Sequence, residues 1–188
     1  MQATEQPKVS VIIPTRNRSD SVGRLLRSIQ GTRDLDKISL EVLVVDNGST
    51  DDTAEYLKET SMKWSLIRPF FEGRAGKNFA LNKGIQEAKG EFLCLMDDDI
   101  VVEPTWLGEL VKDYRTTGYD ALQPRVLPGR DPSGKPAERG RLYQYNIPVI
   151  DYGESVRDLR GLTGVIMSFR REVLDKAGLF DERLPASG

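Results

Sequence analysis

An unbroken apolar run ends directly at three aspartates, and this junction constrains the fold more than any other feature of the chain. Residues 92–96 read FLCLM, and Asp97, Asp98 and Asp99 follow them. A short apolar run is typical of a strand that is buried on both faces, as in a parallel sheet covered by helices. Open sheets of this kind bind ligands at the carboxyl ends of their strands. The three aspartates therefore mark a candidate binding edge.

The aspartates have the chemistry of a cation site. Carboxylates rarely lie against an apolar core unless they are paired or bound to a metal, because removing an anion from water is costly. Side chains alternate along an extended chain, so we expect Asp97 and Asp99 on one side and Asp98 on the other. Two convergent carboxylates suit Mg²⁺ or Mn²⁺, which prefer oxygen ligands. The alternative is an acidic turn exposed to solvent.

The composition narrows the possible chemistry. The chain has 188 residues, of which 38% are hydrophobic, and its net charge of −2 gives no reason to expect nucleic acid as a partner. It contains no histidine, which excludes histidine-dependent nucleophilic catalysis and the usual histidine ligands of zinc. The single cysteine, Cys94, excludes an intrachain disulfide. No apolar run approaches the ~20 residues of a transmembrane helix, so we expect a cytoplasmic protein, with peripheral binding to a membrane left open.

The first half of the chain alternates strand and helix patterns, which predicts βαβ units and a parallel sheet. Strands are expected at residues 9–13, 40–45, 64–67 and 92–96. The first strand should stop at Pro14, and Ser19 or Asp20 should cap the helix that follows and ends at Gly31. Further helices are expected at residues 51–59 and 75–88, and another begins at Pro104.

The second half of the chain is less regular. A strand is expected at residues 120–126, and an extended segment at residues 142–150. Residues 128–140, rich in proline, glycine and charge, predict a mobile surface loop. Residues 161–169 are apolar and glycine-rich, and residues 171–177 predict a short helix that ends at Gly178.

Polar residues follow each of the better-defined strands of the first half. Pro14, Thr15 and Arg16 follow the first strand, and Asp46 follows the second. Because parallel strands align their carboxyl ends, these residues should share one edge with the three aspartates. Asp46 can accept hydrogen bonds from a nucleobase or a ribose. The alternative is a plain turn, which the sequence Asp-Asn-Gly-Ser favours without any ligand.

Two basic residues lie at the start of the third expected helix. Lys77, together with Arg74, places cations near free backbone N–H groups, a combination that suits a diphosphate. Solvated surface cations are the alternative. The common glycine-rich phosphate loops are absent, because residues 14–19 (PTRNRS) contain no glycine and the chain has no Gly-x-x-x-x-Gly-Lys-Ser/Thr motif. Dinucleotide-binding oxidoreductases and P-loop enzymes are therefore excluded.

Several segments, taken in order, resemble the family 2 glycosyltransferases. They are residues 9–17 (VSVIIPTRN), 44–51 (VVDNGSTD), 80–85 (ALNKGI) with 90–92 (GEF), 97–99 (DDD), 164–172 (GVIMSFRRE) and 178–182 (GLFDE). Each segment is a weak signal by itself. The set in the family's order is highly specific, and it spans nearly the whole chain.

The resemblance implies a GT-A fold, which is a Rossmann-like three-layer α/β/α arrangement around a central, mostly parallel, twisted sheet. It implies a single domain with a nucleotide-sugar-binding half at residues 1–102 and a partial acceptor-binding half at residues 103–188. The implied activity is transfer of a sugar from a nucleotide-diphospho-sugar to an acceptor hydroxyl, with inversion expected. We expect a UDP-sugar donor, and a saccharide, lipid-linked or protein acceptor is left open.

The resemblance also implies roles for single residues. Thr15 and Asp46 would contact the base, and residues 97–99 match the family's Asp-x-Asp motif, whose carboxylates hold the ribose and a Mn²⁺ or Mg²⁺ ion. That ion would neutralise charge developing on the nucleoside diphosphate. The expected nucleotide-sugar site comprises Pro14, Thr15, Arg16, Asp46, Lys77, Asp97, Asp98 and Gly164, and the expected metal ligands are Asp97 and Asp99.

The general base is expected outside the chain. In inverting members a carboxylate base follows the segment that resembles residues 184–188, so we expect the base after Gly188 and interpret the chain as truncated. Asp181 and Glu182 are expected to be structural residues that flank a helix. Two alternatives to a glycosyltransferase remain. One is a sugar-1-phosphate nucleotidyltransferase, which normally has a glycine-rich basic loop after its first strand. The other is a fragment that binds a nucleotide without turnover.

Overall fold

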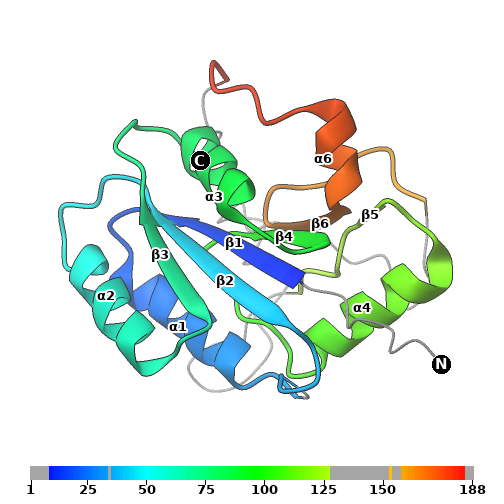
Figure 1. Ribbon diagram of the computed structural model, residues 1–188, viewed down its shortest axis with the longest axis horizontal. Coiled ribbons are helices and arrows are strands. Elements are labelled where there is room, and N and C mark those ends of the chain that lie inside the picture. Colours follow the sequence, from blue (N-terminus) through cyan, green and yellow to red (C-terminus); the bar gives the residue numbers. More distant parts are fainter. Residues whose placement is uncertain (1–8, 34, 128–152, 154–157, 185–188) are drawn as a thin grey trace, which may run out of the picture.

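A six-stranded sheet in the order β3-β2-β1-β4-β6-β5 forms the centre of the computed structural model, which describes residues 9–33, 35–127, 153 and 158–184 (Figure 1). The strands are β1 (Val9–Thr15), β2 (Leu40–Asp46), β3 (Ile67–Phe71), β4 (Phe92–Met96), β5 (Ala121–Leu122) and β6 (Ile166–Arg170). The helices are α1 (Ser19–Gln30), α2 (Thr53–Lys63), α3 (Lys77–Glu87), α4 (Trp106–Thr117) and α6 (Arg171–Ala177).

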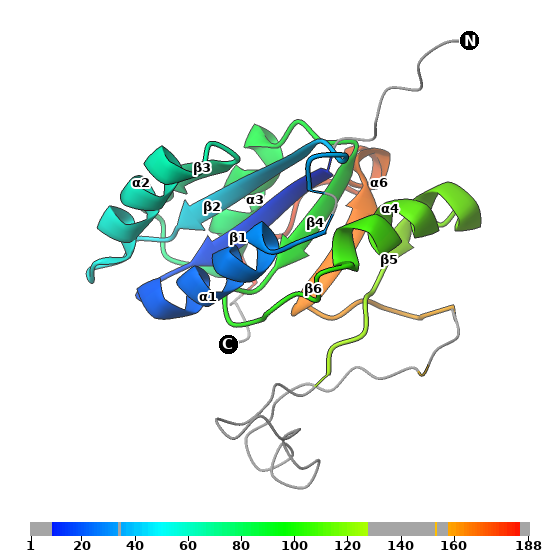
Figure 2. The same cartoon turned by 90° about the horizontal axis from the view of Figure 1, so that it is seen from below.

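The sheet is mostly parallel and is covered on both faces. β1 pairs in parallel with β2 and β4, and β2 pairs in parallel with β3, whereas β6 is antiparallel to both β4 and β5. Helices α1, α2 and α4 pack on one face, and α3 and α6 pack on the other (Figure 2). The three-layer α/β fold expected from the sequence is therefore confirmed.

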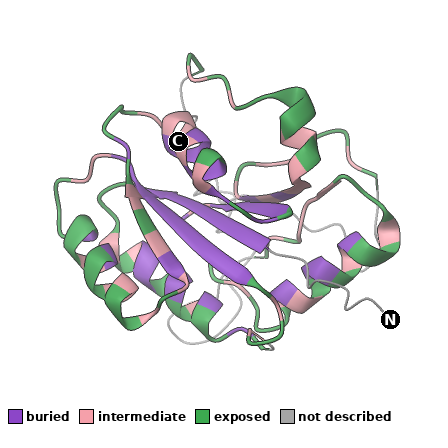
Figure 3. Cartoon of the chain, in the orientation of Figure 1, coloured by how far each residue is buried: buried purple, intermediate pink, exposed green. Residues whose placement is uncertain are grey.

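The central strands are buried on both faces. Val9, Val11 and Ile13 of β1 belong to the core that α1 and α4 cover, whereas Ile12 belongs to the core beneath α3. Every residue of β1, β2 and β4 is buried (Figure 3). This pattern confirms the interpretation of the FLCLM run as a doubly covered strand.

The prediction that the first strand stops at Pro14 is wrong, because β1 continues to Thr15. Along a strand, the N–H groups of successive residues point alternately to the two neighbouring strands. The Val9 N–H donates to Ser39 O on the side of β2, so the N–H groups of even-numbered residues point toward β4. The missing N–H of Pro14 therefore falls on the β4 side. There the β1–β4 pairing has already ended at Ile12, so proline removes no hydrogen bond of the sheet.

Other expected bounds also shift. The third strand is β3, at Ile67–Phe71 rather than residues 64–67, and the strand expected at 120–126 shortens to Ala121–Leu122. The helix expected at 51–59 is Thr53–Lys63. Neither Ser19 nor Asp20 caps α1, because its N-cap position is Arg18, which makes no side-chain cap bond. The predictions for residues 128–140 and 142–150 lie outside the described residues.

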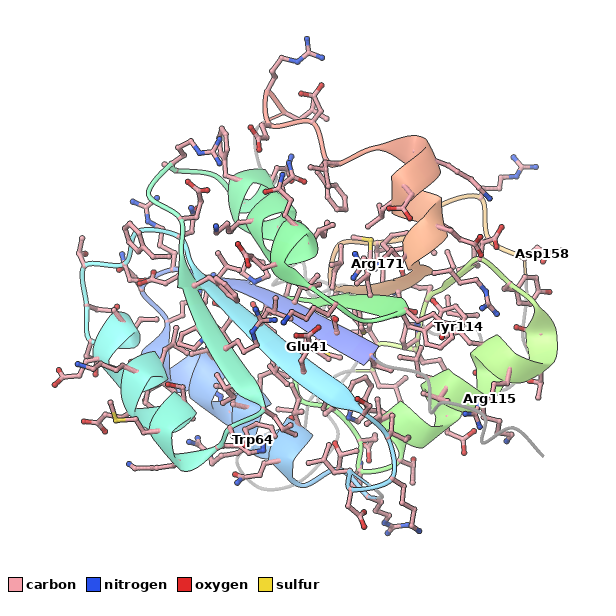
Figure 4. All side chains as sticks on the ribbon, in the orientation of Figure 1. Glu41, Trp64, Tyr114, Arg115, Asp158 and Arg171 are labelled. Atoms are coloured by element: carbon pink, nitrogen blue, oxygen red, sulfur yellow. The ribbon has the colours of Figure 1, made fainter. Side chains whose placement is uncertain are left out.

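One buried carboxylate, Glu41, lies near the amino end of β2 (Figure 4). Its Oε1 accepts hydrogen bonds from Ser10 Oγ (2.7 Å) and the Lys89 N–H (2.6 Å), and its Oε2 lies 2.5 Å from Arg68 NH1. These partners satisfy the charge within the protein, so we interpret Glu41 as structural. No helix in the described part of the chain is long and apolar enough to span a membrane.

Candidate functional site

The carboxyl ends of β1 and β4 bring a hydroxyl and a carboxylate together. Thr15, the last residue of β1, donates from Oγ1 to Asp98 Oδ2 at 2.7 Å, across 83 residues of sequence. Both residues are buried, with 3% of Thr15 and 5% of Asp98 exposed. The Thr15 carbonyl also accepts from the Asn47 N–H at 2.8 Å. The predicted residues of the first, second and fourth strands thus share one edge of the sheet.

The three aspartates do not alternate as an extended strand would. β4 ends at Met96, and Asp98 and Asp99 lie in a turn. Arg18 NH1 donates to both of them, to Asp98 Oδ1 at 3.0 Å and to Asp99 Oδ2 at 3.2 Å. The expectation that Asp98 faces away from Asp99 is therefore wrong, because the extended strand ends at Met96 and the backbone turns at these two residues.

Asp97 has a separate cationic partner. Its Oδ1 accepts a hydrogen bond from Lys77 Nζ at the start of α3. Burial raises the pKa of Asp97, and the hydrogen bond and charge of Lys77 oppose that rise. The Asp97 N–H donates to Val165 O at 2.9 Å, and a Cβ on Gly164 would lie 3.9 Å from Lys77 Nζ. Lys77, Asp97 and Gly164, which were predicted from distant segments, therefore lie together.

Asp46 ends β2 in a turn that its own side chain stabilises. Asp46 Oδ1 accepts from the Ser49 N–H, three residues on, at 2.8 Å, and this local bond between side chain and backbone holds the turn. Asp46 Oδ2 accepts no hydrogen bond from the described residues. The side chain therefore serves the turn with one oxygen and leaves the other for a ligand, so the two interpretations made from the sequence are compatible.

Asn47, which the sequence analysis did not include in the site, holds the next loop in place. Its Nδ2 donates to Glu72 O (3.1 Å) and Arg74 O (2.6 Å), and its Oδ1 accepts from the Gly76 N–H (2.9 Å). These bonds fix the loop that leads into Lys77. An asparagine inside a turn motif is the only sequence signal for this role, and its partners lie 25 to 29 residues away.

The remaining predicted cations have different surroundings. Arg16 lies exposed in the loop after β1, next to buried Pro14 and Thr15. Arg74, in contrast, binds the Glu72 carboxylate with two nitrogens, at 2.9 and 2.8 Å, and lowers the pKa of Glu72 to about 2. Arg74 is thus committed to an ion pair, which leaves Lys77 as the better candidate for contact with a diphosphate.

The segment after α6 is bound to α3 by one buried amide. Asn82 Nδ2 donates to Phe180 O at 2.9 Å and to Glu182 Oε1 at 3.1 Å, and its Oδ1 accepts from the Phe180 N–H at 2.9 Å. Asp181 pairs with Arg183. These contacts accord with the structural roles expected for Asp181 and Glu182.

The carboxylates fit a divalent metal in their chemistry. Asp97 and Asp99 offer only oxygen ligands, which Mg²⁺ and Mn²⁺ prefer. No group of three or more His, Cys, Asp or Glu residues that could hold a metal is present among the described residues. A metal held here therefore needs further oxygens from its ligand, and diphosphate oxygens commonly complete such a site.

A cavity of about 980 Å³ lies elsewhere, between α4, β5 and β6. Its described lining includes Trp106, Leu110, Leu122, Leu159 and Ile166 but none of the predicted site residues. Much of the lining is apolar, and its charged residues are Glu109, Asp113, Arg125, Asp158 and Arg160. We therefore place the candidate site at the carboxyl ends of β1 and β4.

Several known glycosyltransferases are similar to this chain. The family model described as Glycosyl transferase family 2 matches residues 10–178. Glycosyltransferase AglE of Haloferax volcanii is 29% identical over 183 residues, covering 97% of this chain and 59% of its own length. The dolichol-phosphate mannosyltransferase of Pyrococcus furiosus is 29% identical over 171 residues, covering 89% of this chain and 47% of its own length.

Solved structures show the same fold. The mannosyltransferase PcManGT from Pyrobaculum calidifontis, in complex with GDP-Man and Mn²⁺, superposes with a TM-score of 0.68 at 26% identity, over 96% of this chain and 49% of its own. Staphylococcus aureus TarS shares the fold at 21% identity, with a TM-score of 0.72 over 96% of this chain and 52% of its own. The chain spans about half to three fifths of the length of these relatives. The match over residues 10–178 shows that the chain belongs to glycosyltransferase family 2.

Proposed function

We propose that this chain binds the donor of a glycosyltransferase that transfers a sugar from a nucleotide-diphospho-sugar to an acceptor hydroxyl. The convergence of Thr15-bound Asp98, Lys77-bound Asp97 and Gly164 at one sheet edge carries the proposal. Ligands bind at this edge in open α/β sheets. Family membership favours sugar transfer over the sugar-1-phosphate nucleotidyltransferase alternative.

We assign Asp97 and Asp99 as the ligands of Mn²⁺ or Mg²⁺. A bound metal would neutralise the charge that develops on the nucleoside diphosphate as the glycosidic bond breaks. Lys77 lies beside Asp97 and can take part of the same charge. Thr15 holds Asp98 in place, so Asp98 is the carboxylate best fixed to contact the ribose. The Mn²⁺ in the PcManGT complex supports a divalent metal in this fold.

The free Oδ2 of Asp46 supports an acceptor for a base N–H. Buried Pro14 pairs with Val45 in the neighbouring strand, and exposed Arg16 follows the end of β1 beside Asp46. We propose a UDP-sugar as donor. A carboxylate can accept the uracil N3–H, but it can equally accept donors of guanine. GDP-mannose and UDP-GlcNAc, bound in solved relatives, are therefore the natural competitors in a test.

We propose inverting transfer, with a carboxylate as general base. Neither Asp181 nor Glu182 is assigned this role, because Arg183 binds Asp181 and Asn82 binds Glu182. The acceptor side is proposed to involve residues 103–188. A cytoplasmic location, with or without peripheral membrane binding, is proposed on the sequence alone.

Calorimetric titration with UDP, UDP-GlcNAc and GDP-mannose, each with Mn²⁺ and with EDTA, tests the proposal. We expect Mn²⁺ to tighten the binding of the preferred nucleotide at least about tenfold, because the diphosphate and two carboxylates otherwise repel each other. Asp99→Asn should remove most of this metal dependence. Asp175→Asn makes the same chemical change on exposed α6 and serves as the control.

The results separate the parts of the proposal. Equal binding with Mn²⁺ and with EDTA in the unaltered protein would contradict the metal assignment. Preference for GDP-mannose would overturn the UDP assignment and keep the site. Failure of all three ligands to bind would contradict the proposed donor site itself.

A further inference from the structure

The three carboxylates of the candidate site are already neutralised in part by two cations of the chain. Lys77 binds Asp97, and Arg18 bridges Asp98 and Asp99 at 3.0 and 3.2 Å. The two cations come from different segments, the start of α3 and the loop before α1. A divalent metal bound to Asp97 and Asp99 would compete with Lys77 for Asp97 and with Arg18 for Asp99.

Arg18 is fixed at its backbone and exposed at its head. Its backbone N–H donates to Thr53 Oγ1 at 3.1 Å, and its carbonyl accepts from the Val22 N–H at 3.0 Å. The side chain is 53% exposed, whereas the Asp98 side chain is 6% exposed. The guanidinium can therefore leave Asp99, which is itself 54% exposed, without disturbing the backbone.

Arg18 also has donors to spare. A guanidinium carries five N–H donors, and only NH1 binds the carboxylates. Nε and NH2 make no hydrogen bond with the described residues. Planar guanidinium donors match phosphate oxygens well. Once displaced from Asp99, the head of Arg18 can turn toward a diphosphate at the same edge while staying near Asp98.

We propose that Arg18 is an internal counter-ion that competes with the metal for Asp99 and binds the donor diphosphate after the metal displaces it. This inference rests on the proposed function. The competition weakens the binding of metal alone, and the gained phosphate contact strengthens binding of metal and nucleotide together. Arg18 therefore couples the two ligands, and by linkage each must raise the affinity of the other by the same factor.

Manganese titrations followed by the electron paramagnetic resonance signal of free Mn²⁺, with and without UDP, test the coupling. Arg18→Gln removes the competing charge, so Mn²⁺ alone should bind about two- to fivefold more tightly, the range for an exposed ion pair. UDP in saturating Mn²⁺ should bind about three- to tenfold more weakly. Arg24→Gln, six residues further along in α1 and bonded only to Ser21 among the described residues, should change both affinities by less than about twofold.

The opposite signs of the two changes distinguish this role from a structural one, which would weaken both. If Arg18→Gln and Arg24→Gln have the same affinities for Mn²⁺ and for UDP, the counter-ion role is overturned while the proposed metal site stands. The same holds if Arg18→Gln binds Mn²⁺ alone more weakly than the unaltered protein. If the unaltered protein binds no Mn²⁺ even with UDP, both proposals fail. Should Arg18→Gln not fold, the Arg18 guanidinium resonance of the unaltered protein, assigned with Arg18→Lys, should shift on adding Mg²⁺. An unchanged resonance would also overturn the proposal.

Discussion

Gly84 lies where α3 packs closely against the sheet, and Gly84→Ala should destabilise the protein. A Cβ at this position would lie 2.4 Å from Ile12 Cγ2 and 3.3 Å from Val45 Cγ2. Carbon atoms pack at about 3.5–4.0 Å, so helix and sheet would have to separate by about 1 Å. The two methyl groups cannot move aside, because both side chains are β-branched and fully buried.

The sign of the effect depends on two opposing contributions. Replacing a mid-helix glycine by alanine gains about 1 kcal/mol from helix propensity. Forcing a methyl group into a filled core costs about 1–3 kcal/mol, and the 2.4 Å overlap places Gly84 toward the upper end. We expect a net loss of about 1–2 kcal/mol in the free energy of unfolding.

Gly108→Ala is the matched control. Gly108 lies in α4, and a Cβ there would meet no described heavy atom within 4 Å apart from its chain neighbours and the backbone of its own helix. Only the propensity gain remains, so this variant should be more stable than the unaltered protein by a few tenths to about 1 kcal/mol. Urea unfolding followed by tryptophan fluorescence measures both variants. An unchanged or increased stability of Gly84→Ala would refute the close-packing argument.

Two further predictions concern ionised groups near the site. Asp46→Asn keeps the oxygen that accepts from Ser49, so the melting temperature of this variant should hardly change. Its affinity for the nucleotide should fall about tenfold, because a charged acceptor becomes neutral. An unchanged affinity by calorimetry would assign Asp46 to the turn alone. The pKa of Glu72 is lowered from 4.5 to about 2 by Arg74, so the stability from this pair is present above about pH 4.5 and lost as the pH falls toward 2. Arg74→Gln should therefore be less stable than the unaltered protein near neutral pH in urea titrations. The difference in stability should shrink as the pH falls from about 4.5 to 2. A difference that does not depend on pH would contradict the ion pair of Arg74 and Glu72 as its cause.

The parts of the fold predicted from sequence are those that local patterns determine. The FLCLM run predicted a buried strand, and the segment that ends at Gly31 was predicted to be a helix; both are confirmed. The expected position of β3 was wrong because it is an edge strand that contains Pro69, and only Ile67 of its five residues is buried, so its apolar pattern is weak. Leu66 O accepts from the Val42 N–H, so the backbone of Leu66 points toward β2. Pro69, three residues later, points to the other side, which is the open edge of the sheet, so its missing N–H removes no hydrogen bond of the sheet.

The site was predicted at the level of segments but not of contacts. Topology alone brings the strand ends together, so the shared edge of Thr15, Asp46 and the aspartates could be predicted without side-chain detail. Arg18 could not be, because its carboxylate partners lie 80 and 81 residues away and its own neighbourhood looks like an ordinary helix start. Asn82 was missed for the same reason, since its partners follow it by about a hundred residues.

The order of the strands explains why Arg18 and the aspartates meet. From β1 the chain moves outward through β2 to β3, with α1 and α2 on one face of the sheet. It then crosses the opposite face through α3 and returns to pair β4 with β1 on its other side. The direction of winding thus reverses between β1 and β4, and open α/β sheets bind ligands at the carboxyl ends of the strands where this reversal occurs. One loop contributes Arg18 and the other the aspartates, so the fold itself places a cation against the carboxylates before any ligand arrives.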